Sequence, residues 1–252
     1  MDGVPADAGA AACSAFLVAP FVCIVDKSII SNASGRKPLW QSMKDSFKEF
    51  LVRPHVFMRR PEFAWIFGLY GLTYLTANLT DSICEAKSAD KTIPKFLTTS
   101  SVNLTVCIAK DRAFTRMFGV VSPKPLPFAT YALFAARDSL TIFTSFSVPA
   151  HAAKYAQDRQ ILSPERALPA VQIACPLAVQ IISTPMHLLG LDLYNRPKQP
   201  VASRLSFIAR EYLKSTAARF ARIGPAFGIG GVSNTFLRQK FQLMGKEVFH
   251  QA

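Results

Sequence analysis

The sequence AGAAACSAFLVAPFVCIV occupies residues 8–25 and contains no charged residue. It lies between Asp7 and Asp26, and a helix of roughly 20 apolar residues is long enough to cross the ~30 Å hydrocarbon core of a bilayer. Further stretches with few or no charges lie at 63–80, 96–109, 125–153, 167–191 and 223–237. Together the six stretches predict an all-α integral membrane protein with six transmembrane helices. Since half of its 252 residues are apolar, the chain is not a disordered protein.

The positive charge of the chain is concentrated in three segments. Residues 26–60 carry a net charge of +5, 110–124 carry +3 and 192–222 carry +5, which together equal the formal net charge of +13. In a six-helix arrangement these segments follow the first, third and fifth spans and share one side of the membrane. Because basic loops are retained on the side from which helices insert, both termini are expected on the opposite side. A soluble nucleic-acid-binding protein would not segregate charge with this period, so we expect the lipid bilayer and no nucleic acid as a partner.

Signals for catalysis and metal binding are missing from the sequence. It has no G-x-x-x-x-G-K-[ST] loop, no H-E-x-x-H and no G-x-S-x-G motif, and its five cysteines form no C-x-x-C pair. We therefore expect no enzyme activity, no metal site and no cofactor. The first basic residue is Lys27, after the first apolar stretch, so neither a secretory signal nor an Arg-rich transit peptide is expected.

Three similar units follow one another along the chain. The first and fifth apolar stretches contain Pro20 and Pro185, at which we expect helix kinks. Asp26, Asp111 and Asp192 follow the odd stretches or end them, at intervals of 85 and 81 residues. The even stretches open at prolines, which suit the first turn of a helix, at Pro61, Pro123 to Pro127, and Pro225. The chain is thus predicted to form one membrane domain of three pseudo-repeats, at about 8–84, 93–153 and 164–245.

Amphipathic segments connect the two spans of the first and third units. In 39–51 and 201–220, apolar residues recur at intervals of three and four against charged residues. Helices of this kind lie in the membrane interface, so we expect surface helices there. The middle unit has too few residues between its spans for a surface helix.

The last span opens with Arg222-Ile223-Gly224-Pro225, followed by further glycines. Together with three tandem helix–surface helix–helix units and kinked odd helices, this opening resembles the mitochondrial carrier family. The resemblance implies the mitochondrial inner membrane, both termini in the intermembrane space, and solute transport by alternating access. It also places the basic segments on the matrix side, where cardiolipin is an expected lipid partner.

In that family the substrate contacts lie about three positions before the proline of an even helix. This position is Arg222 in the third unit and Lys124 in the second, and in the first unit it lies beside Arg60. Three cations around one cavity would attract a small anion such as a carboxylate or phosphate. The alternative is that these residues are ordinary positively charged flanks of the spans.

Charged residues in or next to the predicted spans are further site candidates, because ionisable groups in a bilayer usually face a cavity or each other. Arg137 and Asp138 are adjacent and are not expected to face one another on a helix. We therefore expect Arg238 as the partner of Asp138. Asp192 and Arg196 have the i,i+4 spacing of a local pair, and a role as a gate remnant is the alternative.

Two functions are compatible with these observations. The first is transport of a small anion, which the cations at the cavity edge favour. The second is a carrier-derived accessory or scaffold subunit of a respiratory-chain or ATP-synthase membrane assembly. The second is favoured because the charges of the P-x-[DE]-x-x-[KR] signature of carriers are displaced in this sequence.

Overall fold

The structure is a computed structural model that describes residues 3–119, 125–146 and 148–250. The described residues contain no β-strand, so the all-α prediction is confirmed. The helices are α1 (Val4–Ala33), α2 (Leu39–Val52), α3 (Pro54–Met58), α4 (Pro61–Ala86), α5 (Thr92–Phe118), α6 (Phe128–Phe146), α7 (Val148–Asp158), α8 (Pro164–Asn195), α9 (Val201–Ile223), the π-helix η1 (Gly224–Gly231) and α10 (Val232–His250).

Helix α1 is the central element of the fold. Its charge-free run folds as one helix of 30 residues with a proline in the first turn, where proline is well tolerated. Ala10, Ala15 and Ala19 are fully buried, and such small side chains let neighbouring helices approach closely. As a result α1 contacts α2, α4, α9, η1 and α10.

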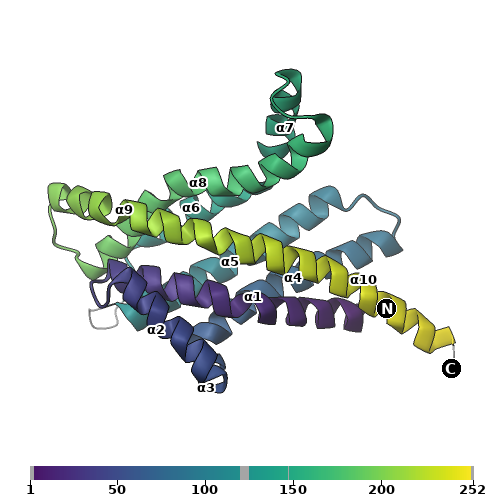
Figure 1. Ribbon diagram of the computed structural model, residues 1–252, viewed down its shortest axis with the longest axis horizontal. Helices are drawn as coiled ribbons and strands as arrows, with labels where there is room; N and C mark the ends of the chain where they lie inside the picture. The colour runs from purple at the N-terminus through teal and green to yellow at the C-terminus, as the bar shows by residue number, and fades with distance from the viewer. Residues whose placement is uncertain (1–2, 120–124, 147, 251–252) are drawn as a thin grey trace.

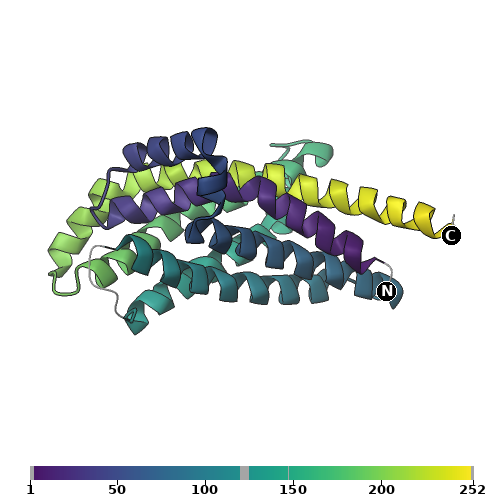
Figure 2. The same cartoon turned by 90° about the horizontal axis from the view of Figure 1, so that it is seen from below.

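The long helices follow one another around a closed ring (Figures 1 and 2). Helix α1 packs against α4, α4 against α5, α5 against α6, α6 against α8, and α8 against α9; α10, which continues from α9, returns to α1. Buried apolar side chains of α1, α3, α4, α5, α6, α8 and α9 form one core cluster. Packed side chains therefore hold the helices of the ring together, in addition to the turns that connect them.

The connections gather at the two ends of the ring. In Figure 1 the turns from α1 to α2 and from α8 to α9 lie at the left, whereas both termini and the turn from α4 to α5 lie at the right. The turns that follow α1 and α8 thus share one end, which we call the basic end, and the end of α5 lies beside it, where its Met117 and Phe118 carbonyls accept hydrogen bonds from Arg36 and Ser34. The side of a membrane that each end faces stays a prediction.

Two helices, α1 and α8, are long and apolar enough to cross a membrane by length and composition. In the described part of the chain, the other ring helices are not apolar enough over a membrane-spanning length, because polar residues interrupt them. Helix α5, for example, carries Thr, Ser and Asn residues at 98–105. The apolar helices agree with a membrane protein, but six spans in three repeats are not confirmed.

Both predicted kink residues lie inside helices. Pro20 is within α1 and Pro185 is within α8, and both helices continue through them. A proline inside a helix removes one backbone hydrogen bond and bends the helix. Figure 2 shows α1 changing direction along its length, and a kink at Pro20 or Pro185 itself stays a prediction.

The third unit differs from the prediction. The amphipathic segment 201–220 is helical, but α9 does not end before Pro225; it continues through η1 into α10, so that 201–250 form one continuous helix. A separate surface helix is therefore wrong for this unit, whereas α2 is a separate helix at the predicted 39–51. Pro225 lacks a backbone N–H and glycines follow it, which favours the wider i→i+5 turns of a π-helix over a helix break.

Candidate functional site

A cluster of charged side chains is buried inside the ring. In the described part of the chain it draws on α1, α5, α6, α8 and α9, and we define this ionic cluster as Asp26, Lys110, Asp111, Arg137, His187, Arg219 and Arg222. These residues border a void of about 10 Å³, which has room for about one water molecule. The ring interior is therefore closed to larger solutes at this level.

Asp26 connects three helices of the ring. Its Oδ2 accepts a hydrogen bond from Lys110 Nζ of α5 at 2.8 Å, and its Oδ1 accepts one from Arg222 Nη1 of α9 at 2.9 Å. Lys110 Nζ also lies 2.6 Å from Asp111 Oδ1. Because an unpaired buried charge is costly, α1, α5 and α9 can separate at this level only if water or a solute replaces these partners.

Arg137 holds α6 to both α5 and α8. Its guanidinium pairs with Asp111 of α5 and with the adjacent Asp138, which lies 2.7 Å away. Its Nη1 also contacts Nδ1 of His187 on α8 at 2.6 Å. Since a guanidinium can only donate hydrogen bonds, Nδ1 of His187 is the acceptor. The proton of the neutral imidazole is therefore on Nε2. Arg137 thus bridges three helices with one planar group.

Arg219 differs from the other cations of the cluster because its partners are neutral. Its Nε donates to Gln180 Oε1 at 3.0 Å and its Nη2 donates to Ser183 Oγ at 3.2 Å, both on α8. Among the residues that the structure describes, no carboxylate lies within 4.0 Å of its guanidinium. When Asp138 is counted with the cluster, four Lys and Arg side chains face three carboxylates. The site therefore carries a surplus of one positive charge, located at Arg219.

A second polar network lies at the other end of the ring, and we define this end network as Asp7, Asn78, Ser82, Asn234 and Arg238. Asp7 of α1 is fully buried; its Oδ1 accepts a hydrogen bond from Arg238 Nε of α10 at 2.7 Å and its Oδ2 accepts one from Ser82 Oγ of α4. One turn further along, Asn78 and Asn234 exchange hydrogen bonds of 3.0 and 2.8 Å. The end network thus joins α1, α4 and α10.

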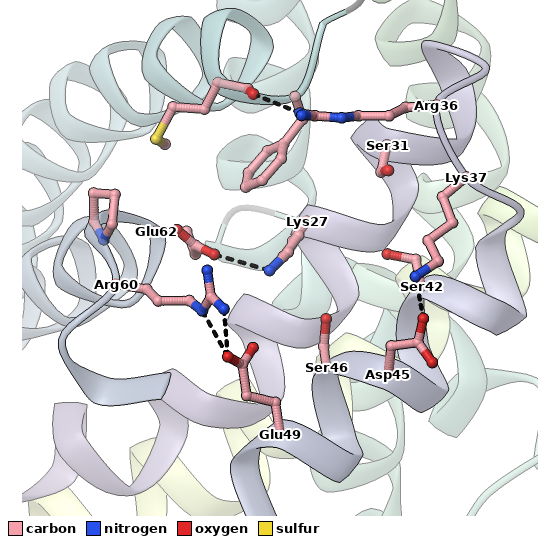
Figure 3. Close-up of a pocket in the computed structure, with 13 residues that line it drawn as sticks. Lys27, Ser31, Arg36, Lys37, Ser42, Asp45, Ser46, Glu49, Arg60 and Glu62 are labelled. Atoms are coloured by element: carbon pink, nitrogen blue, oxygen red, sulfur yellow. Dashed lines mark hydrogen bonds and ion pairs between the residues drawn. The ribbon is translucent and has the colours of Figure 1, made fainter. Parts of the chain in front are cut away.

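A larger cavity of about 720 Å³ opens between α1, α2, α4 and α5 beside the basic end (Figure 3). Its charged side chains are largely paired with each other, as Lys27 with Glu62 at 2.9 Å, Lys37 with Asp45, and Arg60 with Glu49. The hydrogen bond from Arg60 to Glu49 raises the pKa of Arg60 above its ordinary value. Arg36, which also lines the cavity, donates to the backbone carbonyl of Met117 at 2.9 Å. Since Lys37, Asp45 and Arg60 are well exposed to solvent whereas the groups of the ionic cluster are largely buried, the ionic cluster is the better candidate for a solute site.

Of the three predicted substrate contacts, Arg60 and Arg222 are not brought together. Arg60 lines the open cavity, Arg222 belongs to the ionic cluster, and Lys124 lies outside the described residues. Arg222 is paired with Asp26 rather than left free for an anion. A substrate contact at any of the three stays a prediction.

The predicted pair of Asp138 and Arg238 is wrong. Arg238 binds Asp7 in the end network, and Asp138 binds the adjacent Arg137, whose Nε lies 2.9 Å from its Oδ1. Adjacent residues do point to different sides of a helix, but the arginine side chain is long enough to fold back onto its neighbour.

The predicted local pair of Asp192 and Arg196 is present. Arg196 Nε donates to Asp192 Oδ1 at 2.6 Å, and Arg204 of α9 binds the other carboxylate oxygen. Arg204 also donates to the backbone carbonyl of Arg196 at 3.0 Å. These bonds stabilise the turn between α8 and α9. They do not involve the ionic cluster, to which α8 contributes His187 instead.

Five residues of the cluster were not among the predicted site residues: Asp26, Lys110, Asp111, His187 and Arg219. The adjacent opposite charges of Lys110 and Asp111 at the end of an apolar stretch were a usable sequence signal. In the structure both side chains are nearly fully buried. Arg219 gave no signal, because it lies in an amphipathic segment with other basic residues.

The family comparison corrects the resemblance to the mitochondrial carriers. No curated protein and no solved structure matches the chain. Carriers place an acid two residues after the odd-helix proline, whereas Val22 follows Pro20 and His187 follows Pro185 at that distance. The family model that matches is a different one, described as a probable citrulline exporter, and it covers residues 10–242. The chain therefore belongs to the probable citrulline exporter family and, with its apolar helices, is a membrane protein.

Proposed function

We propose that the chain transports citrulline, or an amino acid of the same chemistry, across a membrane by alternating access. The family description supports citrulline as the solute. Citrulline is a zwitterion with a neutral ureido side chain, so its site must satisfy a carboxylate and an ammonium group at once. The ionic cluster offers buried groups of both signs. A zwitterion thus replaces the small anion that the carrier resemblance implies.

The observation that carries this proposal is the presence of polar networks at two depths of the same ring. Asp7 and Asp26 are 19 residues apart on α1, which corresponds to about 28 Å along the helix axis and is close to the thickness of a hydrocarbon core. Ionisable groups at such depths usually mark a solute pathway. If the end network and the ionic cluster open in turn, a solute reaches the ring interior from one end at a time.

We further propose that all the ring helices cross the membrane, including those too polar to be recognised by composition. Some of their polar groups are satisfied inside the ring or on their own helix. Asn103 of α5 donates to Thr73 Oγ1 of α4 at 3.1 Å, and the Thr73 hydroxyl donates to the carbonyl of Leu69 at 2.7 Å. Both arrangements keep polar groups away from lipid, which a polar span requires.

The choice of membrane and the partners stay predictions. The mitochondrial inner membrane and cardiolipin binding rest on the carrier resemblance, which the family match has replaced. The family match favours transport over the alternative of an accessory subunit in a larger membrane assembly. Localising a tagged chain by cell fractionation would test the membrane.

Counterflow of labelled citrulline into liposomes that contain the purified chain tests the function directly. We expect uptake above that of protein-free liposomes, and a loss of at least about tenfold in Asp26→Asn, because this substitution weakens the bonds from Lys110 and Arg222. Asp45→Asn is the matched control, since Asp45 pairs with Lys37 at the exposed surface. Absence of citrulline movement with the intact chain would contradict the proposal.

A further inference from the structure

We propose that Arg219, together with Ser215 and Thr216, binds the carboxylate of the transported amino acid. This inference rests on the proposed function and names the residues that recognise the solute. Arg219 is only 3% exposed, and its described partners, Gln180 and Ser183, are neutral. A buried guanidinium without an anion is costly, and a chain that retains one gains stability when an anion arrives.

The two hydroxyl residues provide an independent observation. Ser215 and Thr216 precede Arg219 by four and three residues, so all three lie along one face of α9. Both are buried, and neither hydroxyl has a hydrogen-bond partner among the residues that the structure describes. Other buried threonines, such as Thr184, donate to the carbonyl four residues earlier. One helix face therefore presents a cation without an anion beside two hydroxyls without partners.

A single carboxylate satisfies this combination of groups. Of the five N–H donors of a guanidinium, Gln180 and Ser183 occupy two, which leaves three for a ligand. The guanidinium fork matches the two oxygens of a carboxylate, and hydroxyls donate further hydrogen bonds to it. The surplus positive charge at Arg219 is opposite in sign to the carboxylate of the solute, while the ammonium group of the zwitterion leaves the net charge of the site unchanged.

Binding of the carboxylate would also act on the ionic cluster. The void of about 10 Å³ is too small for a carboxylate, so the helices that border it, α9 among them, must separate before one can enter. Arg222 lies one turn beyond Arg219 on α9 and is bonded to Asp26 at 2.9 Å. A movement of α9 away from α1 would loosen the contact between Arg222 and Asp26 and would thus couple solute binding to the opening of the ring.

The test compares citrulline with citrulline amide, in which the carboxylate is a neutral carboxamide. Its two readouts are counterflow in liposomes and the rise in melting temperature of the detergent-purified chain. The intact chain should prefer citrulline at least about tenfold, and Arg219→Gln should lower citrulline binding to the level of the amide while leaving the amide unchanged. The matched control is Arg210→Gln on the same helix, whose side chain is 71% exposed, and it should behave like the intact chain.

The outcomes separate the inference from the proposed function. If the intact chain moves neither compound but is stabilised by citrulline and not by the amide, the transport proposal fails and the carboxylate site stands. If the intact chain transports both equally, or Arg219→Gln keeps the preference for citrulline, the carboxylate site is overturned. Should Arg219→Gln fail to fold, Ser215→Ala and Thr216→Val take its place, and an unchanged preference in both overturns the inference.

Discussion

At the residue scale, Asp111 is the most deeply buried side chain of the ionic cluster. Its side chain is 1% exposed and pairs with Lys110 of the same helix and Arg137 of α6. Breaking one side of a buried ion pair leaves an uncompensated charge, which typically costs about 3 kcal/mol or more. We therefore expect Asp111→Asn to lower the melting temperature of the detergent-purified chain clearly, whereas Asp45→Asn at the surface leaves it nearly unchanged.

A double-mutant cycle separates a specific pair from a general effect of burial. Combining Asp111→Asn with Arg137→Gln removes both members of the pair, so the double variant should be destabilised by less than the sum of the two single variants. Additive losses would mean that Asp111 and Arg137 do not act on each other in the folded chain.

Individual pairings were the least predictable part of the site. The adjacency of Arg137 and Asp138 led us to expect Arg238 as the partner of Asp138, but spacing along one helix does not determine which helix packs beside it. The i,i+4 pair of Asp192 and Arg196 was predictable because helix geometry alone brings these residues together. Contacts such as Asp7 with Arg238 depend on the closure of the ring, which no local pattern encodes.

At the element scale, η1 requires close packing against α1 and α4. A Cβ added at Gly230 would lie 2.7 Å from Val18 Cγ2 and would collide with the Tyr74 hydroxyl. That hydroxyl donates to the carbonyl of Ala226 at 3.2 Å, which anchors η1 to α4. We expect Gly230→Ala to destabilise the chain by about 1–3 kcal/mol, as overpacking does, measured as a lower melting temperature.

Gly231 is the matched control for this substitution, because a Cβ there meets no atom within 4 Å. Gly231→Ala should keep the melting temperature of the intact chain or raise it slightly, since alanine stabilises helical backbone. Equal behaviour of the two variants would show that the close approach of η1 to Tyr74 is absent in solution.

The elements themselves followed the sequence more closely than the pairings did. The charge-free run at 8–25 predicted α1, and prolines mark the first turns of α4 and α8. The prediction failed at Pro225, because a proline can open a new helix or be absorbed in a π-helical turn of an existing one. Local sequence does not distinguish these outcomes, since packing of the glycines against Tyr74 contributes to the choice.

At the scale of the whole molecule, the charge pattern and the ring lead to one arrangement. The basic turns share one end of the ring and the termini share the other (Figure 1). An even number of crossings returns the chain to its starting side, so a ring of six spans requires both termini on one side and the three basic segments on the other. If α1 and α8 alone crossed the membrane, the turn between α4 and α5 would lie on the same side as the turn between α1 and α2, and the turn between α8 and α9 would lie on the opposite side.

Single cysteines distinguish these two arrangements. In a variant whose five cysteines are replaced, Lys37→Cys and Lys198→Cys place a thiol in turns of the basic end, and Lys91→Cys places one in the turn between α4 and α5. In sealed liposomes of uniform orientation, we expect a membrane-impermeant maleimide to react with positions 37 and 198 from the same side, and with 91 from the other side alone. Lys91 and Lys198 are exposed and the Lys37 side chain is 38% exposed, so a failure to react reports the membrane and not burial. Labelling of position 91 together with 37 would mean that α4 does not cross, and the alternating opening of two networks across the bilayer would lose its basis.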